Sequence, residues 1–200
     1  MKIGITGGIG SGKSYVARML TQHFGIPVYD CDSRAKSLMT TSLAIRRQLT
    51  ALVGADAYQQ DGQLNRQLLS HYLFSDSLHA SRVNAIVHPA VKSDFLAWAS
   101  RQTAPHVAME SAILLEAGFD DVVDRILSVE APVELRLQRA MQRDGATGEQ
   151  VRHRMALQLA DDERRDKAHA VILNDGRPLL PQLQELFNSE FINLQTYYHA

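Results

Sequence analysis

Short apolar runs, bounded by glycine, proline or polar residues, alternate with longer stretches of helical periodicity. The apolar runs predict buried strands at residues 2–6, 27–30, 106–110, 125–129 and 170–173. In the stretches between and after them, apolar residues recur every three or four positions, which predicts helices at 13–24, 133–143, 149–159 and from about 178 onward. Alternation of this kind is typical of an α/β fold in which helices cover a parallel sheet.

The stretch from residue 33 to residue 101 departs from this alternation because its pattern is helical throughout. It predicts a helical domain inserted after the second strand. The remaining core is then formed by residues 1–32 and 102–200, of which the last ten are expected to fray. Polar, glycine or proline residues predict helix breaks near 40–42, at Gly54, at Asp61-Gly62 and at His88-Pro89.

The first apolar run leads into a glycine-rich segment, Gly7-x4-Gly12-Lys13-Ser14, which matches a phosphate-binding loop. Glycines permit backbone angles at which successive N–H groups point at phosphate oxygens, and the following helix adds the positive end of its dipole. In such loops the lysine reaches the β- and γ-phosphates and the serine can bind magnesium. A glycine-rich turn without a ligand is the alternative. The candidate ATP-binding residues here are Gly8, Ile9, Gly10, Ser11, Gly12, Lys13, Ser14 and Tyr15.

A phosphate-binding loop indicates a nucleotide but leaves the reaction open. The chain lacks the Asn-Lys-x-Asp segment with which GTPases read their base, and ATP-driven motors usually need a longer chain. A small-molecule kinase needs a phosphate-binding loop, a carboxylate near the acceptor hydroxyl, and basic residues that close over the transferring phosphoryl group. We therefore predict an ATP-dependent kinase in which Lys13 is catalytic.

Carboxylates stand at the ends of the predicted strands, the edge where open parallel sheets bind ligands. Asp30 and Asp32 follow the second strand, and we predict Asp32 as catalytic base and acceptor-binding residue. The alternative is that Asp32 caps the helix expected near Ser33. Glu110 is predicted to hold a magnesium-bound water, with an exposed strand-end charge as the alternative. Asn174 either borders the adenine or forms a turn.

Arginine is concentrated in one part of the chain, since 8 of the 16 arginines lie in residues 125–165. Guanidinium groups bind phosphate at two points, which favours a small anionic ligand. Arg136, Arg139 and Arg143 share one helical face that runs into the glycine-containing segment 144–148. This arrangement suits a lid that closes over ATP, and we predict Arg139 as catalytic and Arg143 as ATP-binding. Seven acidic residues in the same region leave a salt-bridged helical surface as the alternative for Arg139 and Arg143.

Charge and composition exclude several partners. A net charge of −1 gives no general attraction to nucleic acid or to an anionic membrane, and no apolar run approaches the roughly 18 residues that span a bilayer. The single cysteine, Cys31, and the absence of a charged-then-apolar leader predict a reducing, cytoplasmic setting. The eight histidines lack zinc-ligand spacing. We expect a monomer or small homo-oligomer.

Several segments together resemble the dephospho-CoA kinase family, over residues 3 to about 186. The phosphate-binding loop is shared by many families. The Ile-Val-His-Pro and Arg-x3-Arg-Asp-Gly segments, in this order, are much more specific. The segments that carry the resemblance are Gly4–Ser14, Asp30-Cys31-Asp32, Leu73-Phe74, Val83–Pro89, Ile113–Gly118, Arg139–Gly145, Arg154 with Gln158, and Val171–Gly176.

The resemblance implies ATP-dependent phosphorylation of the ribose 3′-hydroxyl of dephospho-CoA, the last step of coenzyme A synthesis. It implies an adenylate-kinase-like, three-layer α/β/α fold with a five-stranded parallel sheet, a helical acceptor domain and a lid at about 139–163. Asp32 would then be the base, and Lys13, Ser14 and the lid arginines would act on ATP and Mg²⁺.

The resemblance also makes His88 a candidate for the wall of the acceptor site. Two positions depart from the family pattern: Tyr15 stands where a threonine is usual, and Ala112 where proline is common. Another small-metabolite or nucleoside monophosphate kinase of the same fold is the alternative enzyme. A nucleotide sensor without turnover is the alternative outside the enzymes.

Overall fold

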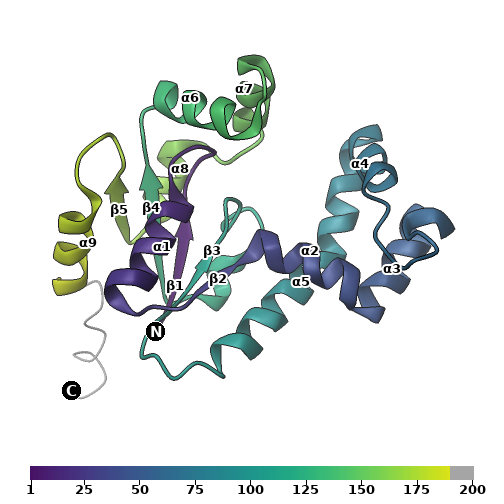
Figure 1. Ribbon diagram of the computed structural model, residues 1–200, viewed down its shortest axis with the longest axis horizontal. Helices are drawn as coiled ribbons and strands as arrows, with labels where there is room; N and C mark the ends of the chain where they lie inside the picture. Colours follow the sequence, from purple (N-terminus) through teal and green to yellow (C-terminus); the bar gives the residue numbers. More distant parts are fainter. Residues whose placement is uncertain (190–200) are drawn as a thin grey trace. The chain divides into compact units, whose positions relative to one another are not determined.

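The computed structural model describes residues 1–189, without the side chains of Phe74 and Ser77, so the expected fraying of the last ten residues lies outside the described residues. The chain forms a five-stranded sheet (Figure 1) with the order β2-β3-β1-β4-β5. Each strand begins and ends within one residue of its predicted bounds, and the predicted α/β fold with a five-stranded parallel sheet is confirmed. The strands are β1 (Lys2–Thr6), β2 (Val28–Asp30), β3 (Val107–Glu110), β4 (Arg125–Glu130) and β5 (Ala170–Leu173).

The middle of the sheet is buried on both faces, which is why its strands read as continuous apolar runs. β1 lies between β3 and β4 and pairs in parallel with both, with Ile5 opposite Glu110 on one side and Leu127 on the other. The apolar cluster on one face joins Ile5 and Leu127 to Val16 of α1 (Lys13–Phe24) and to Leu183 of α9 (Leu179–Asn188). These two helices therefore cover that face of the sheet.

Three helices lie between β4 and β5 in the sequence, namely α6 (Val133–Asp144), α7 (Gly148–Ala156) and α8 (Asp161–Lys167). In Figure 1, α6 and α7 stand beyond the arrowheads of β1 and β4, at the carboxyl edge of the sheet. α7 ends three residues before the predicted end, and α8, which packs against β4, was not predicted. Its seven residues are all charged, so no apolar periodicity marks it as a helix. A 3₁₀ turn, η2 (Phe119–Val122), precedes β4.

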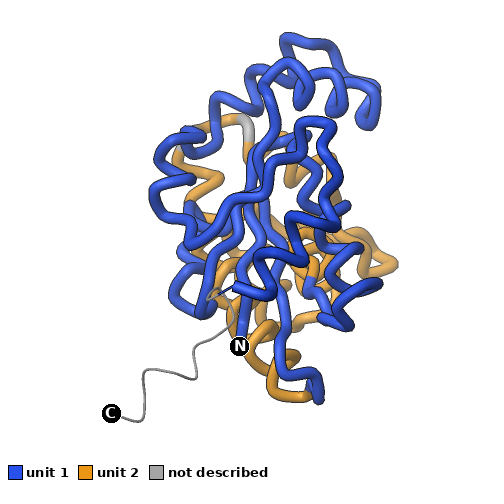
Figure 2. Tube along the Cα trace, turned by 90° about the vertical axis from the view of Figure 1, so that its left-hand side faces the viewer, with its two compact units in different colours: residues 1–29, 102–200 blue, residues 30–101 orange. Residues whose placement is uncertain are grey.

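The chain divides into two compact units, drawn in different colours in Figure 2. The first contains Met1–Tyr29 and the chain from Gln102 onward, and the second is Asp30–Arg101. The sequence analysis placed the inserted domain at residues 33–101. Its role in binding the acceptor stays a prediction.

The second unit is helical. Its elements are α2 (Cys31–Thr41), α3 (Leu43–Val53), η1 (Ala55–Ala57), α4 (Arg66–Ser75) and α5 (Ser77–Ala99). The expected break at His88-Pro89 is wrong, because α5 continues through Pro89. Proline removes one helical hydrogen bond, but the neighbouring Val87, Val91 and Phe95 are buried in a helix that packs against α2, α3 and α4. This burial keeps α5 intact across the proline.

Candidate functional site

The predicted phosphate-binding loop joins β1 to α1. Gly7 and Gly10 have φ values of 148° and 78°, and a Cβ atom on either would collide with the backbone of Val129 or of Arg136. Glycine therefore lets the loop pass this close to β4 and α6. Gly12 begins α1 in a left-handed conformation, and no described side chain caps this helix. The N–H groups of its first turn are thus available to an anion.

Hydrogen bonds within the loop hold its lysine and its amides. The carbonyl oxygen of Gly8 accepts from the backbone N–H of Ser11 over 3.1 Å and from Nζ of Lys13 over 3.3 Å. The backbone N–H of Ile9 donates to Oε1 of Gln158 over 2.7 Å. The Lys13 side chain therefore turns back toward the loop, as the predicted contact with phosphate oxygens requires.

At the end of the loop, Ser14 and Glu110 bring together two oxygen atoms that could bind a metal ion. Ser14 Oγ donates to Oε1 of Glu110 over 2.6 Å. The pairing of β1 with β3 brings Glu110, the last residue of β3, to the edge from which the loop departs. Mg²⁺ prefers oxygen ligands and is usually bound by one or two protein groups together with waters and substrate phosphates. The pair fits a magnesium ion of this kind.

Within residues 1–189 no group of three or more His, Cys, Asp or Glu side chains could hold a metal ion by itself. A magnesium ion at Ser14 and Glu110 would therefore take further ligands from ATP and water.

Arg139 and Asn174 meet beside the loop. Arg139 donates from Nη1 to the carbonyl oxygen of Asn174 over 3.2 Å and from Nη2 to its Oδ1 over 3.4 Å. Asn174 Nδ2 in turn donates to the carbonyl oxygen of Ser11 over 2.8 Å. The structure thus joins two candidate ATP-binding side chains to the loop. The side chain of Asn174 thus bonds to both Arg139 and the loop, and its predicted place beside the adenine stays a prediction.

The guanidinium group of Arg136 is buried and forms an ion pair with Asp161, in place of the mobile contact that a lid residue would make. Its Nη1 and Nη2 donate to the two carboxylate oxygens of Asp161 over 3.1 and 2.7 Å, and Arg164 Nη1 donates to the same carboxylate over 2.7 Å. Arg136 and Arg164 are 6% and 2% exposed. This part of the arginine-rich segment therefore agrees with the salt-bridged alternative, because its guanidinium groups pack in the interior of the first unit.

Arg143 lies at the exposed end of α6. It donates to both carboxylate oxygens of Asp144, over 2.7 and 3.1 Å, and Arg154 of α7 reaches the same carboxylate over 2.9 Å. The hydrogen bond from Arg143, reinforced by Arg154, lowers the pKa of Asp144 to about 2. The predicted contact of Arg143 with ATP stays a prediction, and in this structure the side chain is held within the lid segment.

In the second unit, Asp30 performs the capping that sequence reasoning offered as an alternative for Asp32. Its Oδ1 accepts from the N–H groups of Asp32 and Ser33 over 3.0 and 3.1 Å, because α2 begins two residues earlier than expected. Asp32 lies exposed in the first turn of α2. Its carboxylate has no hydrogen bond or ion pair with another described residue, so it remains available for chemistry.

Two further features of this unit concern the predicted acceptor side. Arg34 of α2 binds Asp94 of α5 through Nε and Nη2, with distances of 2.7 to 2.9 Å, which fixes the helix that carries Asp32. His88 is half-buried, and burial together with nearby Lys92 lowers its pKa. His88 is therefore neutral at pH 7. Its contact with an acceptor stays a prediction.

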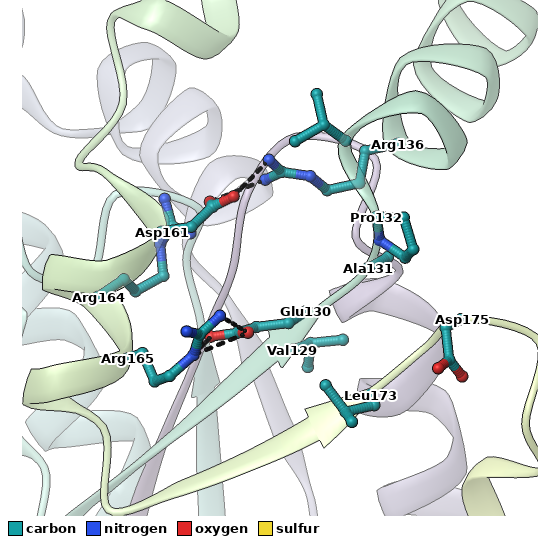
Figure 3. A pocket seen from close by; sticks show the side chains of 11 residues that line it. Val129, Glu130, Ala131, Pro132, Arg136, Asp161, Arg164, Arg165, Leu173 and Asp175 are labelled. Carbon is teal, nitrogen blue, oxygen red and sulfur yellow. Dashed lines mark hydrogen bonds and ion pairs between the residues drawn. The ribbon is translucent and has the colours of Figure 1, made fainter.

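A pocket of about 300 Å³ opens at the carboxyl ends of β4 and β5 (Figure 3). Two ion pairs face it, Arg136 with Asp161 and Arg165 with Glu130. None of the loop residues 7–15 lines it, although Arg136, which does line it, packs against Gly8 of the loop. Its lining is formed by Val129, Glu130, Ala131, Pro132, Val133, Arg136, Asp161, Arg164, Arg165, Leu173 and Asp175.

Sequence reasoning missed several residues that support the site. Gln158 appeared only as part of a family resemblance, and the roles of Asp161 and Arg34 were not predicted. Ile9, Arg136 and Asp94, which bind Gln158, Asp161 and Arg34, lie far away in the sequence, so no local spacing marks these contacts. The buried ion pair of Arg136 could have been suspected only from the number of nearby carboxylates.

Comparison with known proteins gives one consistent result. A family model described as dephospho-CoA kinase matches residues 1–179. A dephospho-CoA kinase from Bacteroides fragilis (strain YCH46) is 49% identical over 93% of this chain and 91% of its own length, and one from Porphyromonas gingivalis is 43% identical over 94% and 93%. A crystal structure of TT1252 from Thermus thermophilus is 34% identical, with a TM-score of 0.81 over 97% of each chain.

Proposed function

Since the chain belongs to the dephospho-CoA kinase family, we propose that Asp32 is its catalytic base and that the phosphate-binding loop holds ATP. The chain catalyses the ATP-dependent phosphorylation of dephospho-CoA, which gives coenzyme A and ADP as the last step of coenzyme A synthesis.

The observation that carries the assignment of the ATP site is the loop geometry. Lys13 Nζ lies 3.3 Å from the Gly8 carbonyl oxygen, and an uncapped first turn of α1 follows. Backbone N–H groups of the loop and of the first turn of α1 would bind the phosphates, except that of Ile9, which donates to Gln158. Lys13 would neutralise the β- and γ-phosphates. Arg139 and Asn174, which are bonded to each other beside Ser11, would contact the nucleotide, as would Arg143 after leaving Asp144.

Ser14 and Glu110 are the residues that would hold Mg²⁺, Ser14 directly and Glu110 through a water. When bound, the ion neutralises phosphate charge as it is redistributed during transfer. The 2.6 Å separation of Ser14 Oγ and Glu110 Oε1 supports a shared role in orienting it.

On the acceptor side, Asp32 would receive the proton of the 3′-hydroxyl. The hydroxyl oxygen forms a bond to the γ-phosphorus, the bond from that phosphorus to the β–γ bridging oxygen breaks, and ADP leaves. The exposed and unpaired carboxylate of Asp32 supports this role. His88, neutral at pH 7, would contribute to the wall against which dephospho-CoA lies.

We propose a cytoplasmic enzyme that acts as a monomer or small homo-oligomer, with no nucleic-acid or membrane partner. The chain contains a single cysteine, Cys31, which is buried, and this suits a reducing compartment. Among the described residues, no helix is both long and apolar enough to cross a membrane.

Acceptor choice tests the assignment against the alternative small-metabolite kinases. With Mg-ATP, the purified protein should release ADP in the presence of dephospho-CoA, and mass spectrometry and NMR should locate the new phosphate at the 3′ position. AMP and shikimate should give no release above the ATP-only background. Release with AMP or shikimate alone would identify a different kinase, and tight ATP binding without any turnover would favour the sensor.

The base is tested by Asp32→Asn, which keeps the size of the side chain and removes its proton affinity. We expect kcat to fall by about 10²- to 10⁴-fold, the usual contribution of a general base, while the Kd for ATP stays unchanged. Turnover near the wild-type rate would show that Asp32 is not the base.

A further inference from the structure

The segment between α7 and α8 touches the phosphate-binding loop and the loop after β3 at the same time. Gln158 makes both contacts: its Oε1 accepts from the Ile9 N–H over 2.7 Å, and its Nε2 donates to the carbonyl oxygen of Ala112 over 3.2 Å. The next residue, Leu159, donates its backbone N–H to Oε1 of Glu116 over 2.9 Å. One side chain therefore connects the end of the lid segment to two loops of the first unit.

A second contact fixes the same segment from the other end. Asp161, the first residue of α8, binds the guanidinium of Arg136 through both carboxylate oxygens. That guanidinium packs against Gly8, where an added Cβ would overlap Nη1, and the Arg136 backbone packs equally close to Gly10. Residues 8–10 of the loop are thus enclosed by groups that belong to α6 and to the segment before α8.

The hydrogen bond to Ile9 has a consequence for Lys13. The Ile9 N–H and the Gly8 carbonyl belong to one planar trans peptide unit, so they point in opposite directions. Fixing the N–H on Gln158 therefore fixes the direction of the carbonyl, and this carbonyl accepts from Lys13 Nζ and from the Ser11 N–H. Rotation of the peptide plane would withdraw the acceptor from both.

We propose that Gln158 is a positioning residue for Lys13, acting through the Gly8–Ile9 peptide plane, and that it links the placement of this lysine to the end of the lid segment. The inference rests on the proposed role of the loop as the ATP site. It also assigns the Ile9 N–H to the protein itself, which leaves phosphate binding to the amides that follow it in the loop.

The first test is Gln158→Leu, a change of similar size that can neither accept nor donate. We expect kcat/KM for ATP to fall by about 10- to 100-fold, the usual effect of a group that orients a residue in contact with the ligand, while KM for dephospho-CoA stays within twofold. The matched control is Gln150→Leu, which removes a capping box at the start of α7 and should retain the wild-type constants. Urea titration establishes that each variant is folded at the assay temperature.

The second test is Gln158→Glu, which decides the matter even if Gln158→Leu does not fold. A protonated carboxyl can accept from Ile9 and donate to Ala112, whereas an ionised carboxylate is repelled by the Ala112 carbonyl oxygen, which moves it away from the Ile9 N–H. The ratio of variant to wild-type kcat/KM for ATP should therefore rise as pH falls through the pKa of the new carboxyl. A side chain that serves only lid packing would give a ratio that does not change with pH.

Three results would overturn the proposal: kcat/KM for ATP within twofold of wild type in Gln158→Leu, an equal loss in Gln150→Leu, or a pH-independent ratio in Gln158→Glu. The Lys13→Ala variant distinguishes a failure of this positioning proposal from a failure of the proposed ATP site. If Lys13→Ala turns over ATP normally, the proposed ATP site is wrong. If Lys13→Ala is impaired while the Gln158 variants are normal, only the positioning role is wrong.

Discussion

Asp30 and Asp32 are separated by one residue, but only the carboxylate of Asp30 has a structural role, as the N-cap of α2. The Asp30 carboxylate is occupied by the N–H groups at the start of α2 and by the hydroxyl of Ser33, 2.6 Å away. Asp32 has no such partner among the described residues and lies exposed. The sequence analysis predicted Asp32 as the base, with a helix cap as its alternative. It did not identify Asp30 as the cap, because aspartate can serve both as an N-cap and as a general base.

This division predicts different effects for the two carboxylates. Asp30→Ala should lower the free energy of unfolding by about 0.5–2 kcal/mol, the usual cost of losing an N-cap, because two backbone N–H groups lose their acceptor. Asp32→Ala should leave it nearly unchanged. Chemical denaturation of both variants measures the difference, and a larger loss for Asp32→Ala would reverse the assignment.

His169 supplies a pH-sensitive contact at the start of β5. Its Nδ1 accepts from the backbone N–H of Ile126 over 3.1 Å, which requires the neutral imidazole. Burial, and to a smaller extent Arg125, lowers its pKa below 6.5. In the unfolded chain the histidine therefore takes up a proton at a higher pH than in the folded protein.

Stability should accordingly fall as pH decreases below about 6.5, because the unfolded state binds more protons there. In His169→Asn the amide oxygen can still accept from Ile126 but does not titrate. The urea midpoint of wild type should thus decline more steeply between pH 7.5 and pH 5 than that of His169→Asn. Parallel declines would show that His169 does not contribute to the pH dependence.

At the scale of elements, prediction succeeded where a segment carries its own signal. The strands were found because burial on both faces makes them continuous apolar runs, and the phosphate-binding loop because its glycines, lysine and serine are contiguous. α8 was missed because all seven of its residues are charged, whereas in the structure its Arg164 is buried and bound to Asp161 and Leu159. The continuity of α5 through Pro89 was missed for a similar reason, since tertiary packing outweighs the local cost of proline.

The same distinction applies to the lid arginines on the α6 face, among which Arg139 is bonded to Asn174, a residue that also contacts the loop. Arg139→Ala should lower kcat by more than it weakens ATP binding, because a charge that stabilises the transferring phosphoryl group acts mainly in the transition state. Arg152→Ala, an exposed lid arginine, serves as control and should change neither. Equal losses in kcat and ATP affinity for Arg139→Ala would indicate ordinary ground-state binding.

Across the whole molecule, the excess of arginine in residues 125–165 is largely compensated by nearby carboxylates. Arg136 and Arg164 share Asp161, Arg165 pairs with Glu130, and Asp144 binds two more arginines. The carboxylates in these pairs offset the charge of the arginines, so the local concentration of guanidinium groups is compatible with a net charge of −1. The concentration of arginine therefore reflects mainly internal ion pairs, with Arg139 as the strongest candidate for direct action on ATP.

Stabilisation by bound ATP tests whether the two units unfold together as one cooperative unit. ATP that binds only the folded chain, at 100 times its Kd, should stabilise it by about 2.7 kcal/mol, which corresponds to about 5–10 °C in Tm for a chain of this size. The only tryptophan, Trp98, lies in α5 of the second unit, whereas the loop belongs to the first.

We expect Trp98 fluorescence and far-UV circular dichroism to report the same shifted midpoint, because Asp30 is at once the last residue of β2 and the N-cap of α2. The end of a core strand and the start of the inserted helices are then the same residue, so one cannot unfold without disturbing the other. Lys13→Ala should abolish the shift in both signals. If ATP shifts the unfolding midpoint measured by circular dichroism but not the one measured by Trp98 fluorescence, the inserted unit unfolds independently.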